Sequence, residues 1–319
     1  MLKGNKITIL TEPTHETPMT NVHAFKRYVK TVLGHALRGP SAVLRSLTEG
    51  FKGEGIHFNY NPKSIKEIGD VVVVLSHIEA LREAIELKRS GKIKKILAGP
   101  NLMNLSNEFD GILASGEIDI CLVPCEWVQV AYEEDNPALV GRIRVWPAGV
   151  DEKFWHPKKI EKSKEVLIYW KTESEEFIRG IENKLGEFGY KPFRIRYSKY
   201  SRDEFREKLS RALFSVFVSK SESQGIALAE SWAMDVPTLV WNPKPSEING
   251  RIYSCISSSP YLNSRLGVEW KTMSDLESLL KQMGSMLCQF QPREWVLENM
   301  TDKVSAQLLL KMISHDKDE

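Results

Sequence analysis

Short runs of apolar residues alternate with segments of helical periodicity along most of the chain. In the first half, runs of strand length occur at residues 6–10, 56–59, 70–75, 95–98, 118–123 and 142–146. After an interruption the alternation resumes, with runs at 166–170, 193–196, 213–218 and 238–241. Buried strands separated by helices are typical of βαβ units with parallel sheets. The pattern therefore predicts an α/β protein with two Rossmann-like, doubly wound domains.

The interruption predicts the domain boundary. Residues 147–165 are bounded by proline and rich in Lys and Glu, which is typical of a solvated connection between domains. The chain has 319 residues, enough for two ordinary domains. We place the first domain at 1–151 and the second at 152–292, facing each other across a cleft. The apolar positions of 293–313 have helical spacing, and we expect this helix to pack back on the first domain.

Composition limits the classes of function. The chain is 42% hydrophobic and 27% charged, with a formal net charge of +2, and has no Lys/Arg run interleaved with aromatic residues, so nucleic acid is not an expected partner. The spacing of Cys121 and Cys125 fits neither a disulfide framework nor a zinc site. No classical signal sequence or apolar span of membrane length is evident. We expect a cytoplasmic protein without a metal.

The most informative segment is 216–241, which predicts a strand, a tight turn, a helix and a second strand. The helix is expected to begin near Gln224, because Ser221 and Ser223 are N-cap residue types. The free amide groups of such a helix end suit a phosphate. Glu222 lies just before this end and Glu230 about two turns later. Two acids and a set of backbone donors therefore converge on one elongated anion that carries hydroxyl groups.

This pair of acids has two other interpretations. A glycosidase pair is disfavoured, because the helical rise from Gln224 to Glu230 is already about 9 Å and glycosidase carboxyls lie about 5 to 9.5 Å apart. In the other interpretation, Ser221 and Glu222 only cap a helix and Glu230 is a solvated acid. Carboxylates also bind sugar hydroxyls well, and a helix end suits a diphosphate. A nucleotide sugar has these parts in this order.

Two stretches carry a family resemblance. The segment SESQGIALAESWAMDVP, from Ser221 to Pro237, resembles the E-x7-E region of retaining, GT-B-fold glycosyltransferases of the family-4 type. A second stretch is similar to the G-V-D-x-x-x-F-x-P signature at the end of that family's first domain, through Gly149, Val150, Asp151, Phe154 and Pro157. The resemblance implies a GT-B fold and transfer of a sugar from a UDP- or GDP-linked donor to an acceptor hydroxyl, with retention and without a metal or other cofactor.

The resemblance also implies roles in the second domain. Glu222 is similar to the acid that holds hydroxyls of the donor sugar, and Glu230 to the acid that holds the ribose. Lys171 stands where the family has Arg and would neutralise the leaving phosphate. The family's second cation is replaced by Glu176. The remaining implied donor contacts are Ser221, Gln224, Gly225 and Ile226 for the diphosphate, Arg179 as a compensating cation, and Tyr197 and Ser198 for the base.

The first domain carries fewer such signals. His77 follows a buried strand at the carboxyl edge, where ligands of α/β sheets bind, and resembles the family's catalytic His. The alternative is a helix cap or a core histidine. Pro100 and Asn101 end the next strand and are expected on the acceptor side, with a plain turn as the alternative. The family's Gly-rich loop is replaced by TEPTHETPMTNVHAF, in which Asn21 is a further acceptor-side candidate.

Residues 21–52 combine basic and apolar residues in a way that suits an anionic membrane surface. A solvated helix with a core face is the alternative. A membrane contact would place the protein at the inner membrane face and favour a glycolipid over a glycan as acceptor. Two other functions stay open: a GT-B sugar phosphorylase or epimerase, and a nucleotide-sugar-binding protein without catalysis.

Overall fold

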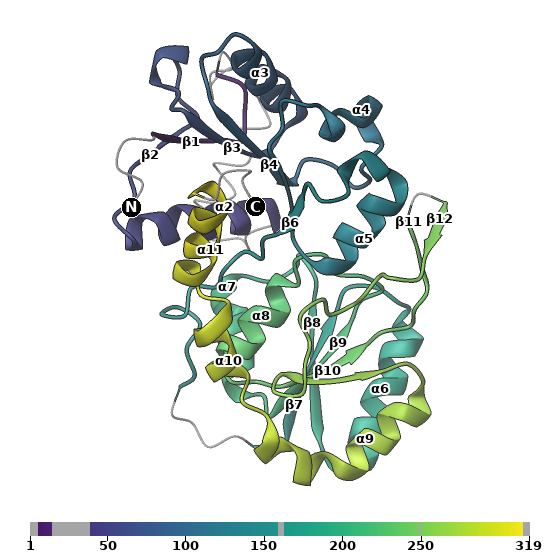
Figure 1. Ribbon diagram of the computed structural model, residues 1–319. Coiled ribbons are helices and arrows are strands. Elements are labelled where there is room, and N and C mark those ends of the chain that lie inside the picture. Colours follow the sequence, from purple (N-terminus) through teal and green to yellow (C-terminus); the bar gives the residue numbers. More distant parts are fainter. Residues whose placement is uncertain (1–5, 15–38, 159–162, 249, 315–319) are drawn as a thin grey trace. The chain divides into compact units, whose positions relative to one another are not determined.

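The computed structural model describes residues 6–14, 39–158, 163–248 and 250–314 (Figure 1). Within these ranges the chain forms two compact units. Unit 1 comprises 6–14, 39–149 and 302–314, and unit 2 comprises the described residues of 150–301. Each unit is a parallel β-sheet flanked by helices (Figure 1).

The sheet of unit 1 has six strands in the order β2-β1-β3-β4-β5-β6, and all neighbouring strands are parallel. Its central strand β3 is buried over five consecutive residues from Val71 to Leu75. Such continuous apolar runs form because helices cover both faces of a parallel sheet. The strands are β1 (Ile7–Leu10), β2 (Phe58–Tyr60), β3 (Val71–Ser76), β4 (Lys95–Asn101), β5 (Ile120–Val123) and β6 (Ile143–Val145).

The described helices of unit 1 include two that pack directly on each other, α2 and α11. Gly50 of α2 makes this approach possible, because a Cβ at this position would stand 2.3 Å from the carbonyl oxygen of Asp302 in α11. The helices are α2 (Gly39–Gly53), α3 (Ile78–Arg89), α4 (Glu108–Gly111), α5 (Glu126–Asp135) and α11 (Asp302–Ser314), with short 3₁₀ turns η1 (Ile65–Glu67), η2 (Ile112–Ala114) and η3 (Pro137–Leu139).

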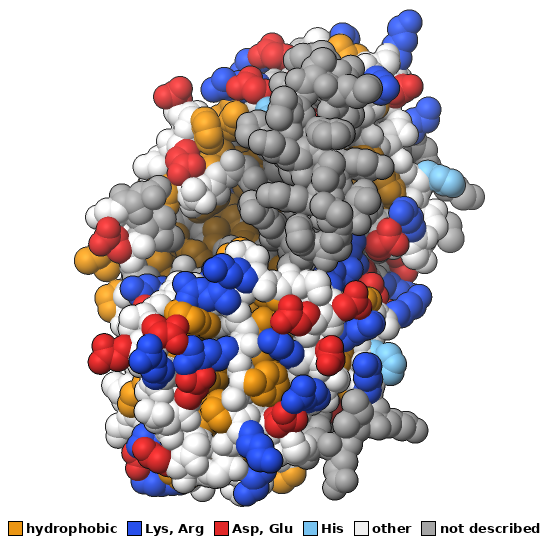
Figure 2. All heavy atoms as spheres, turned by 180° about the vertical axis from the view of Figure 1, so that it is seen from behind, with side chains coloured by type: hydrophobic (Ala, Val, Ile, Leu, Met, Phe, Trp, Pro, Cys, Tyr) orange, Lys and Arg blue, Asp and Glu red, His pale blue; other side chains and the backbone are white. Residues whose placement is uncertain are grey.

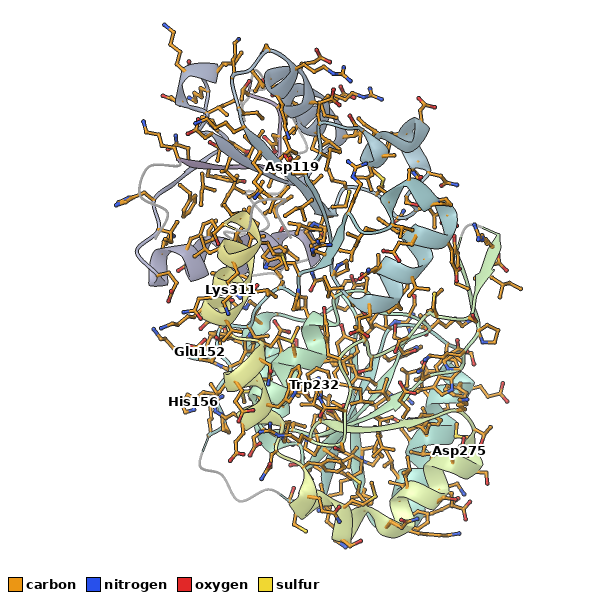
Figure 3. The ribbon with its side chains drawn as sticks, in the orientation of Figure 1. Asp119, Glu152, His156, Trp232, Asp275 and Lys311 are labelled. Carbon is orange, nitrogen blue, oxygen red and sulfur yellow. The ribbon has the colours of Figure 1, made fainter. Side chains whose placement is uncertain are left out.

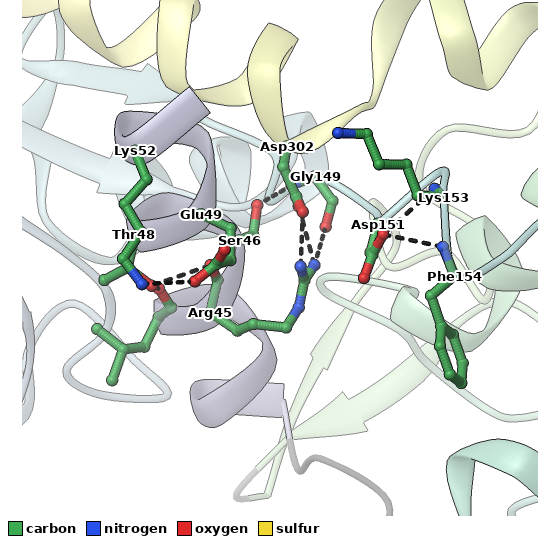
Figure 4. Close-up of polar contacts among 11 residues, drawn as sticks. Arg45, Ser46, Thr48, Glu49, Lys52, Gly149, Asp151, Lys153, Phe154 and Asp302 are labelled. Atoms are coloured by element: carbon green, nitrogen blue, oxygen red, sulfur yellow. Dashed lines mark hydrogen bonds and ion pairs between the residues drawn. The ribbon is translucent and has the colours of Figure 1, made fainter. Parts of the chain in front are cut away.

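Helix α2 also contacts Gly149 and Asp302 (Figure 4). The chain leaves unit 1 after Gly149 and returns to it at Asp302. The Arg45 guanidinium donates to both carboxylate oxygens of Asp302, at 2.5 and 2.8 Å, and to the carbonyl oxygen of Gly149 at 3.5 Å. Ser46 Oγ accepts from Gly149 N at 2.6 Å. The side chains of Arg45 and Asp302 are 20% and 12% exposed, so this ion pair is mostly shielded from water.

Replacing Asp302 with Ala is expected to lower the free energy of unfolding by about 2–3 kcal/mol, somewhat less than for a fully buried pair. The reason is that the shielded Arg45 guanidinium loses its carboxylate partner. Urea unfolding followed by circular dichroism measures the change. The double variant Arg45→Met, Asp302→Leu is the control and should regain more than half of the loss, because it leaves no unpaired charge. Equal stability of Asp302→Ala and the parent protein would contradict this account.

The sheet of unit 2 has five parallel strands in the order β13-β10-β9-β7-β8. A separate antiparallel hairpin consists of β11 and β12. The strands are β7 (Glu165–Trp170), β8 (Lys191–Arg196), β9 (Phe214–Val218), β10 (Thr238–Trp241), β11 (Ser246–Ile248), β12 (Arg251–Tyr253) and β13 (Gly267–Trp270). The helices are α6 (Glu175–Glu187), α7 (Arg202–Arg211), α8 (Ile226–Ala233), α9 (Met273–Met286) and α10 (Pro292–Asn299), with the 3₁₀ turn η4 (Leu287–Gln289).

Two apolar clusters cover the two faces of this sheet. On one face α6 and α9 pack through Ile178, Ile181 and Leu280 among other residues. On the other face α7, α8 and α10 pack on the strands, and Trp232 of α8 is fully buried. The Trp232 indole, labelled in Figure 3, lies in α8. It donates to Thr238 Oγ1 at 3.1 Å, which ties α8 to β10. The position of α8 is therefore set by both packing and a directed hydrogen bond.

Within the connection predicted at 147–165, residues 150–158 pack on the rest of unit 2. Trp155 is buried and packs edge-on against Phe205. The Arg293 guanidinium donates to the carbonyl oxygens of Trp155 and Glu152. The Lys/Glu-rich composition concealed this packing, because one large aromatic side chain and a distant arginine fix the segment.

The helical pattern at 293–313 corresponds to two helices. Helix α10 packs on α8 in unit 2, whereas α11 packs on α2 in unit 1. Between them, the Met300 carbonyl accepts from Val150 N at 2.9 Å, and Thr301 forms a bridge with Val150. The bridge at Thr301 separates α10 from α11, although the helical spacing of apolar residues in the sequence continues across this position.

Acidic and basic side chains are interspersed on the face of unit 2 that Figure 2 shows. Helix α7 likewise carries both signs of charge, since Arg206 pairs with Asp203 and Lys208 with Glu204. A nucleic acid backbone binds to an extended basic field. The mixed charges on this face do not provide one.

Candidate functional site

The strand order of unit 2 places a topological switch point at the carboxyl end of its sheet. From β7 the chain crosses to β8 on one side and then returns to β9 on the other. The loops after β7 and β9 therefore leave the sheet in opposite directions, and ligands of α/β sheets bind at such topological switch points. The backbone N–H groups of Lys171 and Thr172, after β7, both donate to the carbonyl oxygen of Val218 at the end of β9.

Three of the predicted site residues meet at this switch point. Lys171 Nζ lies 2.8 Å from Glu222 Oε1, and the two side chains are 27% and 17% exposed. The same ammonium lies 5.1 Å from the ring centroid of Tyr197, which follows β8. A cation held between a carboxylate and an aromatic face is stabilised by both. The Lys171 ammonium is therefore positioned to bind an anion at the carboxyl edge of the sheet.

The N-terminus of α8 lies in the loop that carries Glu222. Gly225 is the N-cap residue and has a φ of 56°, a left-handed conformation that favours glycine. The helix begins at Ile226, so Ser221 and Ser223 are not its caps and the predicted start near Gln224 is too early. The first N–H groups of a helix lack intrahelical partners, and Gly225 has no side chain to accept from them. This helix end can bind a phosphate.

Two tyrosines that the sequence did not indicate lie close to the acids. The hydroxyl groups of Tyr169 in β7 and Tyr200 are 3.1 Å apart. Burial raises the pKa of both groups above the usual value, and the charges of Glu222 and Glu230 raise it further. The two phenols therefore stay neutral and hydrogen-bonded to each other. Tyr169 was hidden within a buried apolar strand.

The other predicted donor residues are placed as follows. Ser221 is half-buried, and its carbonyl oxygen accepts from Ser219 Oγ at 3.0 Å. Gln224 is buried beside Gly225. Ser198 is exposed and follows Tyr197, with a φ of 59°. Arg179 is 68% exposed on α6, where its Nε lies 3.8 Å from Glu175 Oε1.

Unit 1 has an equivalent switch point between β1 and β3. His77 follows β3, has a φ of 75° and precedes α3. Asn101 ends β4 after Pro100 and lies opposite Ser76 in the sheet. His77 Nδ1 and Asn101 Nδ2 are buried atoms without a hydrogen-bond partner in the described part of the chain. Such orphaned groups suit a polar ligand. Asn21 lies outside the described residues.

Among the described residues, no group of three or more His, Cys, Asp or Glu side chains could hold a metal ion. Within the same ranges no helix is long and apolar enough to cross a membrane. Of the basic residues at 21–52, the described ones are Arg45 and Lys52, which pair with Asp302 and Glu49.

Comparison with solved structures identifies the fold. The apo galactosyltransferase WaaB of the lipopolysaccharide outer core is 12% identical and matches 97% of this chain and 99% of its own, with a TM-score of 0.58. The catalytic domain of starch synthase IV from Arabidopsis thaliana, bound to ADP and acarbose, is 10% identical and matches over 87% and 78% of the two chains, with a TM-score of 0.51. No protein-family model and no curated protein matches the sequence significantly.

A third structure, TarM, is 11% identical with a TM-score of 0.53 and covers 77% of this chain. The chain spans only 55% of the length of TarM. At these identities the comparisons show the fold alone. The two parallel-sheet α/β domains have the fold of GT-B glycosyltransferases, as the sequence predicted.

Proposed function

We propose that the protein is a glycosyltransferase that moves a sugar from a nucleotide-sugar donor to an acceptor hydroxyl with retention of anomeric configuration. The observation that carries this proposal is the meeting of Lys171, Glu222 and the uncapped N-terminus of α8 at the switch point of unit 2. One cation, one acid and a helix end match the phosphate and the sugar hydroxyls of such a donor.

The chemistry follows from these groups. The diphosphate binds at the N–H groups of Ile226 and its neighbours, and Lys171 leaves Glu222 to neutralise it. Glu222 then accepts hydrogen bonds from hydroxyls of the donor sugar, and Glu230 from the ribose. As the bond from C1 to the phosphate oxygen breaks, the bonding electrons leave with that oxygen. The acceptor oxygen bonds to C1 on the same face and passes its proton to the leaving phosphate.

The nucleotide part of the donor is supported by this geometry and by a structural neighbour. A single lysine with a helix end can compensate a diphosphate without a metal ion. The structure of the starch synthase neighbour contains bound ADP, a nucleoside diphosphate. We therefore propose a nucleoside diphosphate sugar, UDP- or GDP-linked as the resemblance implies, with Tyr197 and Ser198 beside the base and no further cofactor.

The acceptor is assigned to the switch point of unit 1. His77 Nδ1 and Asn101 Nδ2 have no hydrogen-bond partner among the described residues, and Asn101 follows Pro100 at the end of β4. An imidazole and an amide suit a neutral sugar hydroxyl better than a phosphate. The proposed acceptor is a glycan or the glycan part of a glycolipid.

Incubation with UDP-, GDP- and ADP-linked sugars and a panel of oligosaccharides tests the proposal. We expect release of one nucleoside diphosphate that depends on the acceptor, and a product whose anomeric proton in NMR has the configuration of the donor. Release of free sugar-phosphate in the presence of phosphate would indicate a phosphorylase instead. Binding without release of nucleoside diphosphate under any condition would contradict transferase activity.

A further inference from the structure

The loop that carries Glu222 is hydrogen-bonded to a second segment, residues 257–259, which is part of the connection between β12 and β13. Ser258 Oγ donates to the carbonyl oxygen of Ser219 at 2.7 Å. Glu222 N donates to the carbonyl oxygen of Ser257 at 2.9 Å. The two hydrogen bonds lie on either side of Ser221, so they fix the backbone at both ends of the short stretch before the acid.

The supporting loop is itself anchored to β10. Asn242 directly follows β10, and its Oδ1 accepts from Ser258 N at 3.3 Å. Its own N–H donates to the carbonyl oxygen of Trp270 in β13 at 2.9 Å. Ser259 N donates to Ser257 Oγ at 3.0 Å, which keeps the three serines in one turn. These hydrogen bonds thus connect the loop after β9, the loop after β10 and the loop before β13 into one network.

This network is buried and lies against the phosphate-binding helix end. Ser258, Asn242 and Ser219 are each at most 2% exposed. Pro260, the next residue of the supporting loop, has its Cδ 3.7 Å from the position that a Cβ on Gly225 would occupy. Buried polar groups hold a geometry strongly, because breaking one of their bonds leaves a partner without water.

We propose that Ser258 and Asn242 are positioning residues that hold Glu222 against Lys171 and beside the N-terminus of α8. This inference rests on the proposed function, in which Glu222 binds the donor sugar. Glu222 needs such support because its own segment, between Ser219 and Gly225, contains no regular secondary structure. A carboxylate on a loop places a sugar accurately only if a second layer of hydrogen bonds fixes the loop.

The first experiment follows the loop itself. Ser258→Ala removes the hydroxyl that binds the Ser219 carbonyl. We expect amide hydrogen exchange in a peptide covering 219–225 to become about five-fold faster, the effect of losing about one hydrogen bond, while a peptide from α2 exchanges as before. The matched control is Ser210→Ala, which removes a buried hydroxyl bonded to the Glu207 carbonyl at 2.6 Å in α7. Unchanged exchange at 219–225 in Ser258→Ala would overturn the proposal.

The second experiment asks whether Ser258 acts through Glu222. The dissociation constant for the nucleotide sugar is measured by calorimetry in the parent, Ser258→Ala, Glu222→Gln and the double variant. We expect Ser258→Ala to weaken binding about ten-fold in the parent and less than about two-fold in Glu222→Gln, since coupled residues are not additive. Equal weakening in both backgrounds indicates a general structural role and overturns the proposal.

The two experiments separate this inference from the proposed function. If the parent protein binds no nucleotide sugar, the proposed function fails, and hydrogen exchange still decides whether Ser258 holds the loop. If the parent binds and transfers a sugar but Ser258→Ala has neither effect, the positioning role fails and the transferase function stands.

Discussion

Glu222→Gln lowers the rate of sugar transfer by about 100- to 1,000-fold, which is the expected result with the largest effect on activity. The amide has the shape of the carboxylate but no charge, so it neither pairs with Lys171 nor accepts strongly from the sugar hydroxyls. Initial rates at saturating donor and acceptor measure the effect.

A matched control for this change lies on the surface of the same unit. Glu187→Gln removes a carboxylate that lies 2.7 Å from Lys184 on α6, away from the switch point. Its rate should equal that of the parent protein. If Glu222→Gln also transfers sugar at the parental rate, the acid has no role in the reaction, and the assignment of the switch point as the donor site fails.

Trp232→Ala lowers the free energy of unfolding by about 3–5 kcal/mol, the largest expected effect on stability. The side chain is fully buried between α8 and the sheet, packs edge-on against Trp295 and donates to Thr238 Oγ1. Its removal leaves a cavity and an unpaired hydroxyl. Thermal and urea unfolding of the purified variant measure the loss.

The control for this prediction is Trp232→Phe, which keeps most of the packing and loses the indole hydrogen bond. We expect it to cost about 1–2 kcal/mol, between the parent and the alanine variant. Because we propose that the N-terminus of α8 binds phosphate, the alanine variant should also bind a nucleoside diphosphate more weakly at a temperature where it stays folded. Parental stability of Trp232→Ala would mean that α8 is not anchored through this residue.

The parallel-sheet framework was predictable from the sequence because its strands are short, continuous apolar runs. The strands found as β3, β7, β9 and β10 lie within one residue of their predicted ranges. Residues 242–291, in contrast, gave no prediction. The strand β13 has only four residues, of which two are buried, and its pattern is too short to recognise. Helix α9 did carry a signal, the capping box of Thr272 and Asp275.

The sequence could indicate those residues of the candidate site that directly follow a predicted strand. Lys171 and Glu222 each follow a predicted strand, which indicated the carboxyl edge of the sheet for both, and the family resemblance implied their roles. That their strands β7 and β9 are neighbours is known from the structure. Ser258 could not be found, because it follows no strand and its partner Ser219 is far along the chain. Asn242 directly follows β10, so the same rule could have indicated it. Tertiary hydrogen bonds of this kind leave no periodic pattern in a sequence.

The central claim is that the edge of unit 2 beside Lys171 and the N-terminus of α8 binds a nucleoside diphosphate. Calorimetric titration of the parent protein and of Lys171→Ala with UDP, GDP and ADP tests it most directly. The account predicts that at least one of the three binds the parent, and that Lys171→Ala binds it about ten-fold or more weakly, because a charge-assisted contact to the phosphate is lost. No binding of any of the three to the parent, or equal affinity in Lys171→Ala, would contradict it.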